Sequence, residues 1–131
     1  MSFLEAVTTY IQTAKIATLG TDMFPLEFPS EAPDDCMIVL DGISGLPPMQ
    51  EVDIIHPGIQ VIVRSKRYPT AMLKAESVYN LFHGAAKHNY YIGTFYVLRS
   101  RARQTPGGIG KDSQDRDEIS VNFDFKIDKG R

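Results

Sequence analysis

Cysteine and tryptophan are scarce in this sequence, which has one cysteine, Cys36, and no tryptophan among its 131 residues. A single cysteine excludes an intramolecular disulfide and zinc sites built from several thiolates. Long apolar runs are also missing, since no window approaches the roughly 20 residues of a membrane-spanning helix. The first residues lack the basic stretch and apolar run of a secretory signal. We therefore expect a protein made in a reducing cytoplasm, with no membrane partner.

An excess of basic charge is absent too, because 14 basic residues face 16 acidic ones and the formal net charge is −2. This balance argues against sequence-independent binding of nucleic acid through a broad basic surface. The hydrophobic fraction of 43% is sufficient for a packed core. The length predicts a single domain that spans residues 1–131.

Two amphipathic helices are predicted from apolar residues at helical spacing. The first runs from Phe3 to Thr13, and Ser2 and Glu5 form the Ser-x-x-Glu signature of a capping box before it. The second runs from about Pro69 to Phe82 and is capped by Gly84. Its expected buried stripe comprises Met72, Ala75, Val78, Tyr79 and Phe82.

Strands are predicted where β-branched and aromatic residues gather or alternate. Glu118–Ile127 alternates most regularly. In Ile59–Ser65, Ile62 breaks the polar side of the alternation, which predicts that this strand is covered on both faces near its middle. The expected strand segments are Cys36–Leu40, Met49–Ile55 leading into Ile59–Ser65, Tyr90–Gln104 and Glu118–Ile127. These elements predict an α+β fold in the order α-β-β-α-β-β. It has a four-stranded, mainly antiparallel sheet with two helices on one face and a long C-terminal hairpin.

Two segments lack any periodic pattern. Residues 21–35 hold three prolines, which predicts an ordered but irregular loop whose aromatics, Phe24 and Phe28, lie on the body or on a partner. Residues 105–117 are rich in glycine and charge, which predicts a flexible hairpin tip.

No motif for catalysis, a metal or a cofactor stands out. Gly107–Lys111 lacks the spacing and the following helix of a phosphate loop. The acidic residues after it lack the ligand order of a calcium loop. His83 and His88 are five apart, which does not align them on one helix face. Cys36 is expected to pack as a small apolar residue. We predict a protein that is not an enzyme and holds no cofactor or metal.

Three arginines alternate along one predicted strand, so Arg99, Arg101 and Arg103 should share a face. Phe95 and Val97 are expected on that same face, nearer the body. The arginines then form either a solvated strand end paired with Asp124 or Asp117, or a contact surface. An acidic protein neighbour is favoured over nucleic acid as the partner of such a surface, because the overall charge is not basic.

Several segments occur in an order that is typical of one family. They are Phe3–Ile11, Met37–Pro48, Pro57–Arg64 with Tyr68–Ala71, and Ile109–Asp112 ahead of Val121–Phe123. Together they cover most of the chain. In this order, and at this length, the sequence resembles the tail terminator (minor capsid, tail completion) proteins of long-tailed bacteriophages.

The resemblance implies a structural protein of the virion tail or neck, made in the host cytoplasm. It implies a homohexameric ring that caps the tail tube, ends its polymerisation and joins tail to head. The partners would be further copies of the chain, the tail tube protein and the head–tail connector, with DNA passing through the lumen without specific binding. The candidate interface residues are Arg99, Arg101, Arg103, Lys111, Phe24 and Phe28.

Other functions stay open from the residues alone. The chain is alternatively a head–tail adaptor or tail-assembly module, a small α+β enzyme or ligand-binding domain, or a nucleic-acid binder.

Overall fold

The computed structural model describes residues 2–42, 53–84 and 87–130, and these form two helices and eight strands. Residues 43–48 of the segment Met37–Pro48 and most of the predicted Met49–Ile55 segment lie outside the described residues. The helices are α1 (Phe3–Thr13) and α2 (Tyr68–Phe82). The strands are β1 (Met23–Pro25), β2 (Cys36–Asp41), β3 (Ile54–Ile55), β4 (Gly58–Ser65), β5 (His88–Ile92), β6 (Phe95–Ala102), β7 (Gly107–Lys111) and β8 (Asp117–Asp128).

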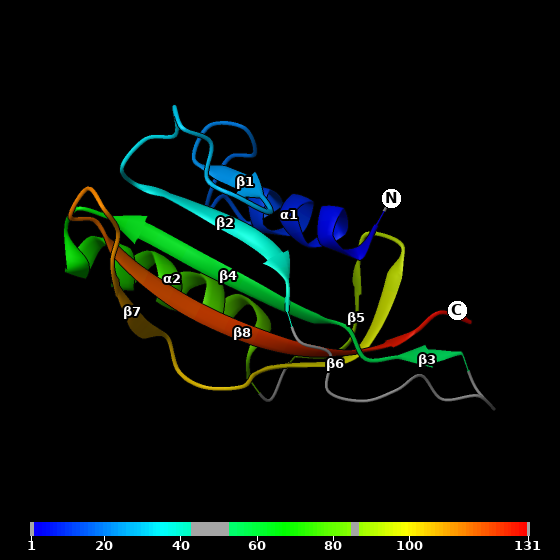
Figure 1. The fold of residues 1–131 in the computed structure, drawn as a ribbon. Helices are drawn as coiled ribbons and strands as arrows, with labels where there is room; N and C mark the ends of the chain where they lie inside the picture. The colour runs from blue at the N-terminus through cyan, green and yellow to red at the C-terminus, as the bar shows by residue number, and fades with distance from the viewer. Residues whose placement is uncertain (1, 43–52, 85–86, 131) are drawn as a thin grey trace.

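All eight strands belong to one sheet, whose main order is β1-β2-β4-β8-β6-β5 (Figure 1). The strand β8 is its centre: β4 and β3 pair along one edge of β8, and β7 and β6 pair along the other. Every pairing is antiparallel except that of β1 with β2. The predicted α+β class is confirmed, whereas the predicted count of four strands is wrong.

Three features account for the extra strands. The predicted strand Tyr90–Gln104 turns back at Gly93, whose φ of +61° suits a tight turn, and so forms both β5 and β6. A three-residue strand, β1, lies inside the proline-rich loop, and β3 pairs with the end of β8. The segment predicted as a hairpin tip contains β7, which pairs with residues 117–120 of β8. Strands pair through backbone groups, so short strands such as β1, β3 and β7 can form without an alternating pattern of side chains.

Both helices begin as their sequences predict. The Ser2 hydroxyl accepts a hydrogen bond from the Glu5 N–H at 3.1 Å, and the Glu5 carboxylate accepts one from the Ser2 N–H at 3.4 Å. This capping box satisfies two backbone donors that the first helical turn leaves unpaired. Helix α2 carries Pro69 in its first turn, and Gly84, with φ +138°, follows its last residues.

One face of the sheet and both helices enclose the core. From β8 the core takes the alternate side chains from Ile119 to Ile127, and from α2 it takes chiefly Val78 and Phe82. Ala71 joins the predicted stripe of α2, while Met72 and Tyr79 lie at its margin, partly buried. The sheet curls around this core, so that α1 contacts β1 and β2 near one edge of the sheet and β5 at the other (Figure 1).

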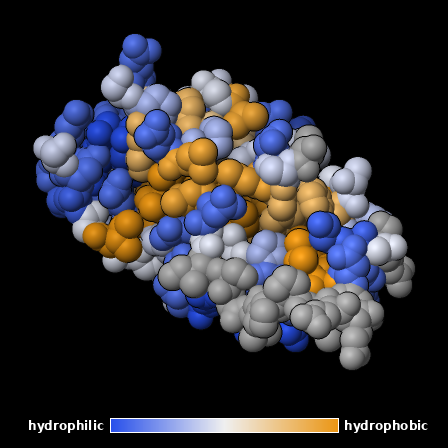
Figure 2. Space-filling view, turned by 45° about the vertical axis from the view of Figure 1, so that its right-hand side comes forward, coloured by the Kyte–Doolittle hydropathy of each residue, from blue (hydrophilic) through white to orange (hydrophobic). Residues whose placement is uncertain are grey.

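The opposite face of the sheet, here called the outer face, is mixed. Ile62 lies half-buried on it between Ile38 and Ser120, so the expected cover of this strand on both faces is partial. Figure 2 shows a band of apolar side chains across the middle of the molecule, with hydrophilic ones around it. No helix among the described residues is long and apolar enough to cross a membrane.

We expect Phe82→Ala to lower the free energy of unfolding by about 3–5 kcal/mol, because it removes a buried ring and leaves a cavity. The Phe82 ring is fully buried and lies 5.3 Å from the Phe123 ring and 5.5 Å from the Phe125 ring between centroids. Urea denaturation measures the change. On the same helix, Leu73→Ala serves as control, because Leu73 is 67% exposed and its truncation should cost less than about 0.5 kcal/mol. Equal losses for the two variants would contradict this account of the core.

A second prediction concerns pH. Burial raises the pKa of Tyr90 to about 12, and its hydroxyl lies 2.6 Å from the Ser100 hydroxyl, which itself donates to the Phe82 carbonyl. An unfolded tyrosine ionises near pH 10, so the unfolded state loses this proton first as the pH rises. Stability should therefore be full below about pH 10 and fall as the pH rises towards about 12.

Urea midpoints measured across this alkaline window provide the test. Tyr90→Phe should show a shallower loss of stability than the wild type. The control is Tyr68→Phe, which changes a 47% exposed phenol and should leave the slope unchanged. The same slope in the wild type and Tyr90→Phe would refute the assignment.

Candidate functional site

The three arginines that were predicted to share a face, Arg99, Arg101 and Arg103, lie on the outer face because of a bulge in β6. The register of β6 against β8 shifts between Val97 and Arg99. Val97 pairs with Ile127 and is fully buried, whereas Arg99 pairs with Lys126 and is exposed. One extra residue in a strand moves the side chains after it to the other face. The prediction that Phe95 and Val97 share a face with the arginines is therefore wrong.

The backbone of β5 is irregular at the same place. Asn89, with φ +54°, lies between the residues that pair with Val97 and Arg99. Asparagine tolerates this left-handed conformation better than most residues. His88 consequently faces Arg99, and Arg99 faces Lys126, so three basic side chains lie in register across β5, β6 and β8. Like charges directly opposite one another are unfavourable in a sheet.

A hollow of about 370 Å³ lies beside this row. Its lining contains basic side chains and no carboxylate among the residues that the structure describes there, namely His83, Gly84, Lys87, His88, Arg99, Ser100 and Arg101. The His83 Nδ1 atom accepts a hydrogen bond from the Ala102 N–H at 3.0 Å, so this nitrogen carries no proton. Such a hollow suits a carboxylate or another anion.

The other arginines have a partner within the chain. The Nε atom of Arg103 lies 2.7 Å from Asp124, and that of Arg101 lies 3.9 Å from the same carboxylate. The predicted pairing with Asp124 is thus confirmed for Arg103 and is at the limit of an ion pair for Arg101. In the part of the chain that the structure describes, no carboxylate lies within ion-pair distance of Arg99.

Lys111 lies far from the arginines. Its ammonium is 3.2 Å from Asp117 and 3.7 Å from Asp115, and the hydrogen bond to Asp117 raises the pKa of Lys111. Lys111 pairs with Asp117 and Arg99 with Lys126, nine residues further along β8. At about 3.3 Å per residue the separation is about 30 Å. The structure therefore divides the predicted basic set into two places.

The aromatic residues of the proline-rich loop pack on their own chain. The Arg64 guanidinium lies 4.2 Å from the centroid of the Phe28 ring, and its Nη2 donates to the Pro33 carbonyl at 2.8 Å. Arg64 is only 4% exposed, and this contact holds the loop against β4. Phe24 is half-buried beside Ile38 on the outer face. Sequence reasoning did not find the role of Arg64, because its partners are about thirty residues away.

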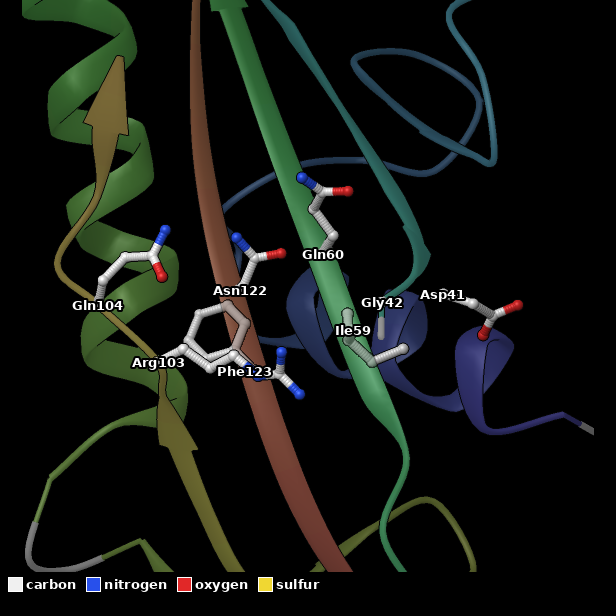
Figure 3. A pocket seen from close by; sticks show the side chains of 8 residues that line it. All are labelled: Asp41, Gly42, Ile59, Gln60, Arg103, Gln104, Asn122 and Phe123. Carbon is white, nitrogen blue, oxygen red and sulfur yellow. The ribbon is translucent and has the colours of Figure 1, made fainter. Parts of the chain in front are cut away.

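A second hollow, of about 450 Å³, opens on the outer face beside β4 and β8 (Figure 3). Gln60 and Asn122 line this hollow from the adjacent strands β4 and β8. Arg103 and Gln104 line it from the segment that follows β6 (Figure 3). Amide groups of this kind can hydrogen-bond a polar partner in several ways. Their alternation with buried residues in β4 and β8 was the signal that could have found them.

Cys36 behaves as its sequence context predicts. Its side chain is 5% exposed, and burial raises the pKa of the thiol although Arg64 opposes the shift. No group of three His, Cys, Asp or Glu side chains within residues 2–42, 53–84 and 87–130 is placed to hold a metal ion.

Comparison with known proteins connects this fold to one family. No curated protein matches the sequence. A chain from the structure described as "Virion of native gene transfer agent (GTA) particle" is similar, with a TM-score of 0.69 and 14% identity. The match covers 95% of the present chain and 93% of that chain, and at this identity it supports the fold alone.

A family model is more specific. The model described as bacteriophage tail terminator protein matches residues 10–129, which is most of the chain. The resemblance found in the sequence is thereby confirmed. The chain belongs to the bacteriophage tail terminator family and is a protein of the virion.

Proposed function

We propose that this chain is a structural protein that caps the tail tube as a homohexameric ring. In this role it ends tail polymerisation and joins the tail to the head–tail connector without catalysing a reaction. The single observation that carries the proposal is the family match over residues 10–129. The similar fold of a chain in a gene transfer agent virion supports it.

The shape of the sheet suits a ring. Closed rings are built from heterologous contacts, in which two different surfaces of each copy meet. The sheet ends at β1 on one side and at β5 on the other, and these strands differ in length and sequence. Two dissimilar ends allow each copy to bind one neighbour on each side.

The candidate interface residues contribute unequally to this proposal. Arg99 and Arg101 offer exposed positive charge to a neighbour, the tube or the connector. Arg103 and Lys111 are held by carboxylates of their own chain, so they contribute as ion pairs. Phe24 and Phe28 act indirectly, by fixing the shape of the loop that carries Leu26, which is 59% exposed. A net charge of −2 fits DNA passing through the lumen without being retained.

Capping of tail tubes tests the proposal. Tail tube protein that polymerises without this chain should give tubes of uncontrolled length, because their ends stay open. Added protein should stop elongation and should appear in electron micrographs as a ring at one tube end. Light scattering of the complex released from the tubes should give six times the 14.6 kDa of one chain.

The control is an equal amount of the chain unfolded by heat before addition. A folded wild-type chain that leaves tube length unchanged would contradict the capping role. Binding to the head–tail connector without binding to tubes would indicate an adaptor instead. A released complex of another mass would contradict the hexamer.

A further inference from the structure

The outer face of β5, β6 and β8 carries a cluster of basic side chains, of which Arg101 lies 3.9 Å from Asp124. We call it the basic face and define it by Lys87, His88, Arg99, Arg101 and Lys126. Neither Arg99 nor Lys126 has an ion-pair partner among the described residues. The hollow of about 370 Å³ beside Arg99 gives this charge a concave shape.

A surface of opposite sign lies on the segment Leu26–Glu31, here called the acidic loop. Glu27 and Glu31 are exposed, and within the described part of the chain neither has an ion pair. The loop is held in place, since the Leu26 N–H donates to the Val39 carbonyl at 2.9 Å and Phe28 packs on Arg64. Carboxylates on a fixed loop lose little conformational freedom when they bind.

These two surfaces lie at opposite corners of the sheet. The acidic loop joins β1 to β2 at one edge, and the basic face lies at the other (Figure 1). They are also far apart along the strands. Arg64, on which the loop packs, pairs with Glu118, whereas Arg99 pairs with Lys126, eight residues further along β8. This is about 26 Å at the usual rise of a strand. One molecule therefore cannot bring its own two surfaces together.

We propose that the acidic loop of each copy docks on the basic face of the next copy around the ring, an inference that rests on the proposed function. Glu27 and Glu31 bind the guanidinium groups of Arg99 and Arg101 and enter the hollow between them. Arginine and carboxylate groups match in geometry and form short, charge-assisted hydrogen bonds. Leu26 and Tyr91, 59% and 55% exposed, give each surface one large apolar side chain next to its charges.

A second copy fits this surface better than nucleic acid does. Asp124 and Asp128 lie on the same face of β8 as Lys126 and confine the positive charge to a small area around Arg99, which suits two carboxylates on a loop better than a continuous phosphate backbone. The net charge of −2 opposes nucleic acid as well. A ring needs two complementary surfaces on one chain, and the acidic loop and basic face supply them in the required positions.

Charge reversal in both surfaces tests the contact. The variants E27K/E31K and R99E/R101E should each raise the concentration needed for ring formation at least about tenfold, because like charges then meet. The four changes combined in one chain should restore the ring, because the attraction returns with its sign exchanged. Light scattering gives the mass in solution, and electron microscopy gives the ring at tube ends.

The control K15E/K129E makes the same change in net charge as R99E/R101E at two exposed positions that belong to neither surface. It should assemble like the wild type. Urea denaturation of every variant separates a lost contact from a lost fold. Reversed variants that are folded and still form rings at wild-type concentration would overturn the inference and leave the proposed function standing. If the variant that combines all four changes is folded but does not regain assembly, the inference is overturned too.

A cross-link provides a measurement that does not depend on rescue. The only native cysteine, Cys36, is buried, so cross-links should form between the introduced cysteines and not through Cys36. Chains carrying E27C and chains carrying R99C should give cross-linked pairs when mixed on tail tubes, and neither should do so alone. Tubes capped without such pairs would overturn the contact. A wild type that forms no ring on tubes would instead remove the proposed function itself. Loss of DNA retention by R99E/R101E rings of unchanged mass would identify nucleic acid as the occupant.

Discussion

The position of β8 in the middle of the sheet is the constraint on which the rest of the structure depends. Its alternate side chains, Ile119, Val121, Phe123, Phe125 and Ile127, are all at most 2% exposed. A shift of one residue in its register would place every one of them in solvent. Four strands pair with β8, so its alternation decides which of their side chains meet the helices. The charges of the outer face therefore follow from the burial of the inner one.

The bulge in β6 decides which charged side chains this outer face presents. Before it, Val97 follows the core pattern of β8, and after it Arg99 and Arg101 face outward while Ser100 and Ala102 are buried. Bulges re-aim side chains and are common where a sheet serves a function. The cost is a pair of like charges, Arg99 opposite Lys126, which an acidic partner would offset. Local strand geometry thus connects the packing of the core with the charge that the outer face presents.

Sequence reasoning succeeded where local patterns decide the structure. The capping box at Ser2, the stripe of α2 and the alternation of β8 are all set by residues close in the chain. The pairing of Arg103 with Asp124 follows from the antiparallel pairing of the two predicted C-terminal strands. Sequence reasoning failed where distant backbone decides. The bulge at Arg99 depends on the register of β8, the glycine strand β7 on a free edge of β8, and the burial of Arg64 on Phe28. None of these leaves a periodic signal in the sequence. For that reason Phe95 and Val97 were wrongly predicted to share a face with the arginines.

Segregated charge has a consequence for the symmetry of any assembly. A chain with net charge −2 could distribute its charges evenly, yet the acidic loop and the basic face lie at opposite corners of the sheet. Two copies that meet through the same surface place like charges together, which disfavours an isologous dimer. Two copies that meet head to tail place opposite charges together. Each added copy leaves one acidic loop and one basic face unpaired at the two ends of the row, until the last copy binds the first. The charge pattern therefore opposes a two-fold dimer and favours head-to-tail association, which closes into a ring where the rotation between copies allows it.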